Sequence, residues 1–395
     1  MAIKALTAGL AASALLIAGG GNAVGSAGRL SSARPDNPAV PIVYMVDLSS
    51  GAVLAARGEQ RRFVPASIAK VMTLFVAFEM IAQGKLDPEA RFAYSDQAFR
   101  DWDQTGSTMY ISAGAEVRVD DLLMGIANVS ANDGAVVLAE GAAGSVQNWV
   151  DRMNRTAREL GMRDTRFGTP NGWPDEGATF TTAQDLVTLA RAMVARHPQL
   201  YARYIGKPEF TYNGITQPNR DPLTGRVAGA DGIKTGFTNQ AGNGFLGSAV
   251  RNGRRLAFVV AGADSMEARN ALARDLVEWG FAATSSSPLY RQGATVGTAL
   301  VQGGEDLSVP LITNMPVRAT FPAPAAPAGE STVSLSIRYL GPLRAPVRKG
   351  EAVAELIISV DGMTPSSVPL VAGASVARAE GLGRLRNGLV GLVRW

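Results

Sequence analysis

The 395-residue sequence contains no cysteine and a single histidine, His197. The absence of cysteine excludes disulfide bonds, a thiolate nucleophile and thiolate metal ligands. One histidine excludes metal sites built from several histidines, and a Ser-His-Asp triad would have to use His197. Because Pro198 follows it, His197 is better interpreted as a residue that ends a helix and caps its carbonyl groups.

Lysine is also scarce, although the chain is basic. The 38 lysine and arginine residues include only six lysines: Lys4, Lys70, Lys85, Lys207, Lys234 and Lys349. A lysine can lose its proton and act as a base, whereas an arginine in a protein cannot. A lysine inside a short motif is therefore informative in this chain.

Long apolar runs are missing from the body of the chain, which has none of the roughly 18–20 residues that a spanning helix needs. The formal charge is +4. A basic surface attracts nucleic acid, anionic lipid or anionic wall polymer. The charges are scattered, and arginines do not alternate with aromatic residues as in single-strand binders. We therefore do not expect nucleic acid as a partner.

Residues 1–33 have the pattern of an export signal. Lys4 precedes an uncharged run of small and apolar residues, and no acidic residue occurs before Asp36. This order predicts a signal peptide, with candidate cleavage positions after Ala23, Ala27 and Ala33. The alternative is a retained anchor. In either case we expect an exported, periplasmic protein, peripheral on the outer face of the inner membrane.

Residues 34–284 mix helical and strand patterns, which predicts an α/β or α+β domain. Hairpins are expected around Ser49-Ser50-Gly51 and around Asn252-Gly253. Helices are expected over residues 65–83, 119–127, 133–142, 148–160, 182–195 and 266–281.

Residues 285–378 predict a smaller β-rich domain, and residues 284–288 mark the boundary before it. Apolar and polar residues alternate over 333–339, as in a half-buried strand, and residues 352–360 predict another strand. The Pro/Ala-rich segment 322–328 is interpreted as an extended loop between strands.

Three short motifs follow one another in the first domain. They are Ser67-Ile68-Ala69-Lys70 (S-x-x-K), Ser130-Ala131-Asn132 (S-x-N) and Lys234-Thr235-Gly236 (K-T-G). Each motif alone is weak, since an S-x-x-K occurs by chance in about every chain of this size. In this order and context they match the set found in penicillin-binding enzymes and β-lactamases.

Ser67 and Lys70 are expected on one face of a helix, because they are three residues apart. In the first turn, the backbone N–H of Ser67 is free to face a developing oxyanion. Burial and a second cation lower the pKa of a lysine, and Lys234 is the natural second cation. A neutral Lys70 could then take the proton of Ser67, the candidate nucleophile. The alternative for Ser67 is an ordinary residue at a helix N-terminus.

Ser130 is a candidate to relay the proton to the leaving group, and Asn132 to orient the substrate amide. The alternative is a helix-capping turn, and both roles can hold together. Lys234, Thr235 and Gly236 are expected on an edge strand, where an ammonium and a hydroxyl meet the substrate carboxylate and glycine permits close approach. The alternative is a lysine on a solvated strand end.

With these motifs the chain resembles the serine D-alanyl-D-alanine carboxypeptidases among the low-molecular-mass penicillin-binding proteins. The resemblance runs from about Pro41 to the C-terminus, and residues 65–73, 217–220, 231–238 and 341–351 carry it. It implies a penicillin-binding/β-lactamase-like transpeptidase domain of α/β (α+β) type, followed by a smaller β-rich domain.

The resemblance also implies a reaction. Ser67 attacks the carbonyl between two D-alanines of a peptidoglycan stem peptide, the last D-alanine leaves, and water hydrolyses the acyl-enzyme. The backbone N–H groups of Ser67 and Phe237 form the oxyanion hole, β-lactams acylate Ser67, and neither a cofactor nor a metal is implied. Two residues depart from the pattern: Ala131 replaces a usual glycine, and Asn171 stands where many relatives carry histidine. No role is transferred to Asn171.

Two other functions remain as alternatives. A class A-type β-lactamase needs a glutamate that activates the deacylating water, and no convincing E-x-x-x-N segment follows Asn132. The second, β-rich domain also argues against it. A protein that binds penicillin or stem peptides without turnover is the other alternative, and the intact Ser67, Lys70, Ser130 and Lys234 argue against it.

Residues 379–395 are expected to form an amphipathic tail on an anionic membrane. Leucines recur at helical spacing, and the segment also contains arginines and ends in Trp395. Four glycines each weaken an isolated helix by about 1 kcal/mol relative to alanine. A frayed tail is the alternative.

Overall fold

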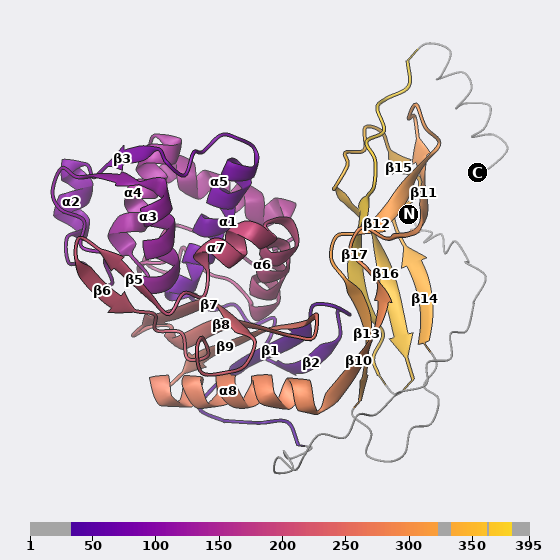
Figure 1. Cartoon of the computed structure of the whole chain (residues 1–395), viewed down its shortest axis with the longest axis horizontal. Helices are drawn as coiled ribbons and strands as arrows, with labels where there is room; N and C mark the ends of the chain where they lie inside the picture. The colour runs from indigo at the N-terminus through magenta and orange to yellow at the C-terminus, as the bar shows by residue number, and fades with distance from the viewer. Residues whose placement is uncertain (1–32, 323–332, 362, 381–395) are drawn as a thin grey trace. The chain divides into compact units, whose positions relative to one another are not determined.

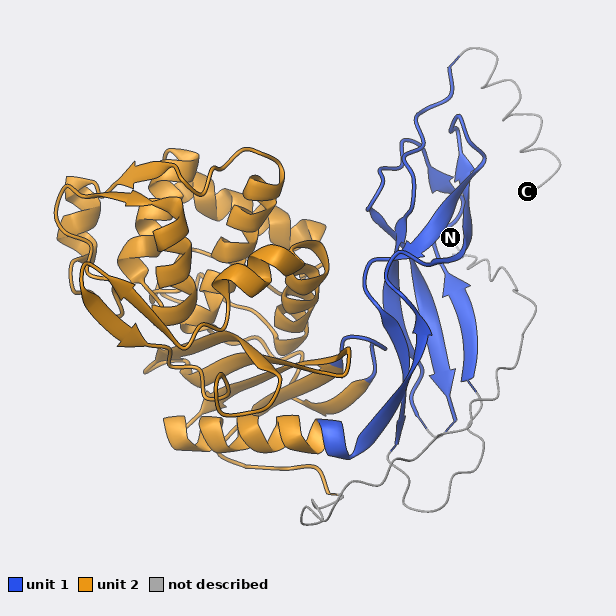
Figure 2. Cartoon of the chain, in the orientation of Figure 1, with its two compact units in different colours: residues 1–30, 47–52, 281–395 blue, residues 31–46, 53–280 orange. Residues whose placement is uncertain are grey.

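The computed structural model describes residues 33–322, 333–361 and 363–380. The chain divides into two compact units (Figure 2). The larger unit comprises residues 31–46 and 53–280, and the β unit comprises residues 47–52 together with the chain from residue 281 onward. Each unit has its own buried core.

The larger unit is built on a five-stranded sheet in the order β2-β1-β9-β8-β7. Because β7 is the last strand in this order, the K-T-G motif lies on an edge strand, as expected. The predicted Asn252-Gly253 turn joins β8 to β9, and both of its residues have positive φ, as a two-residue hairpin turn requires. The strands are β1 (Ile42–Asp47), β2 (Val53–Arg57), β7 (Ala230–Thr238), β8 (Gly242–Arg251) and β9 (Arg254–Ala263).

Helices cover both faces of this sheet (Figure 1). On one face lies α8 (Met266–Ala282), where a Cβ added to Gly280 would meet Met45 of β1 and Leu256 of β9. On the other lie α1 (Lys70–Ala82), α2 (Asp96–Trp102), α3 (Val119–Met124), α4 (Asn132–Ala143), α5 (Val146–Glu159), α6 (Ala183–Arg196) and α7 (Pro198–Tyr204). Two hairpins complete the unit, β3 (Arg91–Ala93) with β4 (Glu116–Arg118) and β5 (Glu209–Tyr212) with β6 (Ile215–Pro218).

The start of α1 differs from the prediction. Residues Ala66–Ala69 form a short 3₁₀ turn, η1, and the α-helix begins only at Lys70. Ala66 has φ 48°, a left-handed conformation from which a regular α-helix cannot continue. Ser67 therefore lies in the 3₁₀ turn rather than in the first α-helical turn. At the other end, Gly84 is left-handed as predicted, and the helix ends at Ala82, one residue early.

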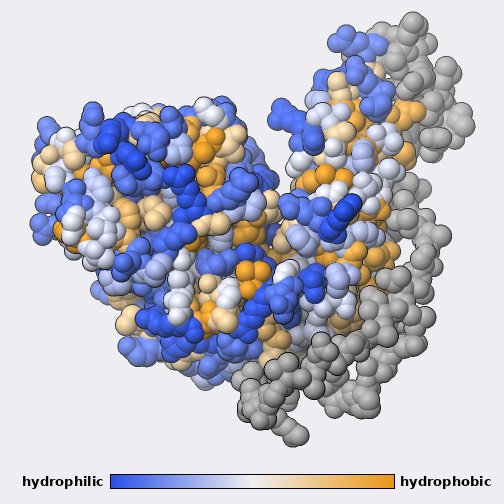
Figure 3. Space-filling model, viewed as in Figure 1, coloured by the Kyte–Doolittle hydropathy of each residue, from blue (hydrophilic) through white to orange (hydrophobic). Residues whose placement is uncertain are grey.

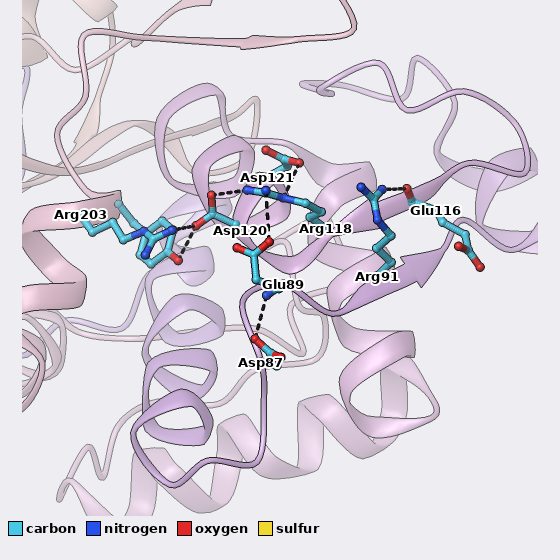
Figure 4. Close-up of polar contacts among 9 residues, drawn as sticks. Asp87, Glu89, Arg91, Glu116, Arg118, Asp120, Asp121 and Arg203 are labelled. Atoms are coloured by element: carbon cyan, nitrogen blue, oxygen red, sulfur yellow. Dashed lines mark hydrogen bonds and ion pairs between the residues drawn. The ribbon is translucent and has the colours of Figure 1, made fainter.

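A network of ion pairs fixes the start of α3 (Figure 4). Arg118, the residue before α3, pairs with Asp120 at 2.9 Å and with Asp121 at 3.4 Å. Asp120 also pairs with Arg203 of α7 at 2.6 Å. From α3 the chain continues through a π-helical turn, η2 (Gly125–Val129), which ends at Ser130. The network thus holds the segment that leads to the second motif.

His197 has a different environment from the one expected. It joins α6 to α7, and its Nε2 lies 2.9 Å from Oε1 of Glu79 on α1. Its ring packs edge-on against Phe75 and Phe78. The prediction that its side chain caps the helix carbonyls is therefore wrong, because the buried ring turns toward α1.

The β unit has a six-stranded sheet, β14-β16-β17-β12-β11-β15, and a separate pair, β10-β13. Its core is formed by aliphatic residues that alternate along the strands, including Ile337, Leu356 and Ile358. Thr320 donates a hydrogen bond to Asp47 over 2.7 Å, which anchors residues 47–52 in this unit. The strands are β10 (Thr284–Tyr290), β11 (Thr295–Gln302), β12 (Ser308–Thr313), β13 (Val317–Pro322), β14 (Val333–Arg338), β15 (Leu343–Arg344), β16 (Ala352–Val360) and β17 (Ser366–Ala372).

Several expectations concern other parts of the chain. Residues 284–288, interpreted as a boundary, begin strand β10. The proposed signal peptide lies almost wholly outside the described residues, as do most of the 322–328 loop and nearly all of the tail. Among the described helices, none is both long and apolar enough to cross a membrane. In the view of Figure 3, hydrophilic residues cover most of the larger unit, and hydrophobic residues appear in small separate areas.

Candidate active site

A cleft of about 570 Å³ in the larger unit brings the three motifs together. Ser67 comes from η1, Ser130 and Asn132 from the segment between η2 and α4, and Thr235 to Phe237 from β7. Lys70 and Lys234 are buried. Three exposed hydrophobic side chains, Trp173, Phe237 and Met266, also line the cleft. All eight site residues expected from the sequence therefore lie in or directly beside one cleft.

The ammonium of Lys70 is held by three oxygen atoms. Its Nζ lies 2.9 Å from Oγ of Ser67, 2.7 Å from Oδ1 of Asn132 and 2.7 Å from the backbone oxygen of Asn171. The amide and backbone oxygens can only accept hydrogen bonds, whereas the Ser67 hydroxyl can also donate one. A neutral Lys70 therefore gives its two hydrogens to Asn132 and Asn171 and turns its lone pair toward Ser67.

The surroundings of Lys70 favour this neutral form. Burial, and then the nearby charge of Lys234, hold the pKa of Lys70 well below its usual value, although the carboxylate of Asp133 opposes the shift. Both causes match the expectation from the sequence. Lys70 is thus placed to act as a base toward Ser67.

The second motif forms a tight bend between two helices. Ser130 has a left-handed backbone with φ 66°, and α4 begins at Asn132. Asn132 accepts the hydrogen bond from Lys70 through Oδ1 and donates one from Nδ2 to the carbonyl of Thr105 over 2.9 Å. Ala131 is the N-cap residue of α4, and no side chain caps this helix. The capping role considered for Ser130 and Asn132 is therefore not what the bend uses them for.

Ala131, which replaces the usual glycine, fits this bend without backbone strain. Its φ is −52°, a value open to every L-residue, and its side chain is fully buried. A Cβ added to Gly134 would lie 3.2 Å from the Ala131 methyl group. Gly134 therefore leaves the space that this methyl group needs.

The third motif lies where β7 passes η1. Lys234 donates a hydrogen bond to the carbonyl of Thr235 over 3.0 Å. Burial, and then the charges of Arg220 and Arg269, lower the pKa of Lys234 to about 7. A Cβ added to Gly236 would lie 2.5 Å from the backbone oxygen of Pro65, so only glycine allows β7 to pass so close to the Ser67 turn.

Comparison with known proteins identifies the family. Residues 32–265 match the family model described as D-alanyl-D-alanine carboxypeptidase. The chain belongs to this family. Residues 285–378 match a second model, the C-terminal domain of penicillin-binding protein 5.

Similar proteins extend over most of the chain. D-alanyl-D-alanine carboxypeptidase DacA of Haemophilus influenzae is 31% identical over 88% of this chain and 87% of its own length. DacD of Escherichia coli is 31% identical over 92% of this chain and 94% of its own. The crystal structure of penicillin binding protein 5 from H. influenzae has a TM-score of 0.69, at 30% identity, and covers 87% of this chain and 99% of that one.

The chain is thus a serine D-alanyl-D-alanine carboxypeptidase with a penicillin-binding domain followed by a β-rich domain. The relatives do not favour the β-lactamase alternative. Among the described residues, no group of three histidine, aspartate or glutamate side chains is arranged to hold a metal ion.

Sequence reasoning missed two cationic residues of the carboxypeptidase cleft. Arg220 lines the cleft and donates a hydrogen bond to Oγ of Ser107 over 3.0 Å, and Arg269 reaches the same cleft from α8. The resemblance of segment 217–220 was a signal for Arg220. Nothing in the local sequence marks Arg269, because α8 meets the cleft only through the tertiary fold.

Asn171 contributes to the cleft through its backbone. Its carbonyl binds Lys70, and its side-chain Oδ1 accepts a hydrogen bond from the backbone N–H of Trp173 over 3.0 Å. A Cβ added to the adjacent Gly172 would lie 1.9 Å from the backbone oxygen of Ala66. The backbone therefore sets this contact, and the side chain at position 171 does not make it.

Proposed function

We propose that this carboxypeptidase removes the terminal D-alanine from peptidoglycan stem peptides through an acyl-enzyme on Ser67. The observation that carries this proposal is the position of Lys70. Its Nζ lies 2.9 Å from Oγ of Ser67, while two oxygens that can only accept take the other two positions around the nitrogen. Lys70 is the base, and Ser67 is the nucleophile.

In the first half-reaction, Ser67 transfers its proton to Lys70 as Oγ attacks the carbonyl carbon of the penultimate D-alanine. The negative charge on the carbonyl oxygen is stabilised by the backbone N–H groups of Ser67 and Phe237. As the C–N bond breaks, the proton passes from Lys70 through Ser130 to the leaving nitrogen, and free D-alanine departs. A water molecule then attacks the ester, Lys70 takes its proton, and the proton returns to Ser67 as the shortened peptide leaves.

The terminal carboxylate of the substrate binds at the K-T-G strand. Lys234 supplies an ammonium, Thr235 a hydroxyl, and Gly236 allows the peptide backbone to come close. Arg220 and Arg269, whose charges act on Lys234, add to the positive potential there. Asn132 orients the substrate amide with the amide hydrogen that it does not give to Thr105.

We further propose that β-lactams acylate Ser67 and block the enzyme. Penicillin-binding protein D2 from Listeria monocytogenes was crystallised in an ampicillin-bound form and a cefotaxime-bound form, and is 28% identical over 62% of this chain. We also propose that the protein is exported to the periplasm by residues 1–33 and held on the inner membrane by residues 379–395. Release into the periplasmic fraction after truncation of the tail would support the membrane contact, and unchanged partition would contradict it.

The test of Ser67 is covalent labelling. The mature protein is incubated with a fluorescent penicillin, digested, and analysed by mass spectrometry beside Ser67→Ala. We expect one labelled peptide, which contains Ser67, and no label in the variant. A label on another residue, or none in the parent protein, would contradict the assignment. A label that persists without any hydrolysis of D-alanyl-D-alanine peptides would favour a binding protein without turnover.

A further inference from the structure

A second concave region of the larger unit is lined by arginines and lies outside the active-site cleft. It consists of two hollows of about 550 and 200 Å³ along α5, both lined by Arg155. No residue of either hollow is among those that line the cleft. We call this region the arginine groove; its basic residues are Arg152, Arg155, Arg158, Arg163 and Arg166.

These arginines have no acidic partner. Within the described residues, no ion pair within 4.0 Å involves any of the five. Elsewhere in the same unit, exposed or half-buried arginines are paired, as Arg203 is with Asp120 and Arg255 with Asp231. In addition, the Nε of Arg152 is buried without a hydrogen-bond partner. Buried polar groups without a partner are uncommon in folded proteins.

The local charge balance is strongly positive. Two acidic residues, Asp151 and Glu159, line the hollows beside the five arginines, and Asp164 is already paired with Arg62 at 2.7 Å. Arg152, Arg155 and Arg158 follow one another at intervals of three on α5, so their charges repel across neighbouring turns. An anion that enters the groove relieves this repulsion and supplies the missing hydrogen-bond acceptors.

We propose that the arginine groove binds carboxylate groups of the peptidoglycan polymer and holds the enzyme on its substrate between turnovers. This inference rests on the proposed function, because peptidoglycan is the substrate named there. Each stem peptide presents carboxylates, and removal of D-alanine leaves another, so the polymer offers repeated anions. A groove on the catalytic unit that contacts such a polymer raises the local concentration of stem peptides at the cleft.

The lining of the groove favours such a polymer over two other polyanions. A protein surface that lies on a membrane inserts exposed Trp, Phe or Leu side chains between the lipids, whereas the only apolar side chains of the hollows are buried or half-buried. Binding of single-stranded nucleic acid uses aromatic side chains for stacking, and neither hollow has one.

The test is co-sedimentation of the full chain with purified, protein-free peptidoglycan at low ionic strength. The variant R155E/R158E/R163E is compared with R91E/R100E/R274E, which makes the same change of charge on β3, α2 and α8 of the same unit. We expect the first variant to bind at least about tenfold more weakly than the parent protein, and the control to bind much like it. Added salt at about 0.5 M should remove the difference.

Two further arms make the result decisive. R155Q/R158Q/R163Q should weaken binding in the same direction, which covers the case in which the glutamate variant does not fold. Hydrolysis of a soluble D-alanyl-D-alanine peptide should stay within about twofold in both groove variants, since the groove is remote from the cleft lining. Ser67→Ala should bind the polymer like the parent while losing hydrolysis, so failure of the catalytic assignment is recognised separately.

Equal sedimentation of the parent protein and the groove variants would overturn the proposal, as would an absence of binding by the parent. Loss of binding to vesicles containing phosphatidylglycerol, with binding to peptidoglycan retained, would assign the groove to lipid and also overturn it.

Discussion

The backbone carbonyl of Asn171 accepts a hydrogen bond from Nζ of Lys70 over 2.7 Å. Together with Oδ1 of Asn132 it occupies both hydrogens of a neutral amine, which leaves the lone pair for Ser67. The contact depends on the backbone and not on the side chain at position 171. It explains how the cleft is compatible with asparagine where many relatives carry histidine.

Replacement of Lys70 separates its charge from its basicity. Lys70→Arg keeps a cation but removes the base, so acylation of Ser67 by a β-lactam should fall about 10³-fold, and Lys70→Met should fall at least as far. The measurement is the second-order acylation rate constant. Lys85→Met, at an exposed position just beyond α1, is the control. A Lys70→Arg enzyme within tenfold of the parent would show that Lys70 is not the base.

The rate of acylation should rise with pH as Lys70 loses its proton. Burial and Lys234 hold the pKa of Lys70 well below 10.5, so the midpoint of this rise should also lie well below 10.5. The profile is obtained from acylation rates between pH 5.5 and 10.5. A midpoint near 10.5 would mean that Lys70 has the pKa of an ordinary exposed lysine.

Stability should depend on pH through the same residue. Between the lowered pKa of folded Lys70 and the unfolded value of 10.5, unfolding takes up a proton. The free energy of unfolding therefore rises with pH across this window, by up to about 1.4 kcal/mol per pH unit. Below the window both states are protonated and the slope disappears. Urea unfolding of the parent and Lys70→Met should show a difference that shifts in favour of the parent as pH rises, and parallel curves would contradict this.

Gly236→Ala should disturb the nucleophile directly. The added methyl group would lie 2.5 Å from the backbone oxygen of Pro65 and 3.0 Å from Cγ1 of Ile68, on either side of Ser67. We expect a loss of about 1–3 kcal/mol in unfolding free energy and a larger relative loss in acylation rate. Thermal unfolding and penicillin labelling measure the two effects. Unchanged labelling would show that β7 can move away from the turn at no cost.

Ala131→Gly restores the more usual second motif and should cost stability without a gain in rate. The methyl group is fully buried, so its removal should cost about 0.8 kcal/mol, and glycine adds about 0.5–1 kcal/mol of backbone entropy. Because Ala131 already has φ −52°, the bend should keep its shape. A change of more than about tenfold in kcat/KM would show that the methyl group affects the substrate.

Much of the site was predictable because its information is local. The spacing of Ser67 and Lys70 predicts their contact, and Asn252-Gly253 predicts the β8–β9 hairpin, since both depend on a few neighbouring residues. The position of Lys234 on an edge strand follows from the same pattern of strands.

What the sequence did not predict depends on distant segments. Arg269 reaches the cleft from α8, and the Asn171 carbonyl meets Lys70 across 101 positions of the chain. His197 turns to Glu79 because α6 and α7 pack beside α1, and a local capping pattern contains no sign of this. The left-handed Ala66 likewise has no sequence signal, since alanine is a typical residue of regular helices.

The central claim is that Ser67 carries a carboxypeptidase reaction. The most direct measurement is release of D-alanine from a diacetyl-lysyl-D-alanyl-D-alanine peptide by the mature protein, beside Ser67→Ala. We expect release by the parent protein and none above background by the variant. Equal release by both proteins, or no release by the parent together with no penicillin labelling, would contradict the account.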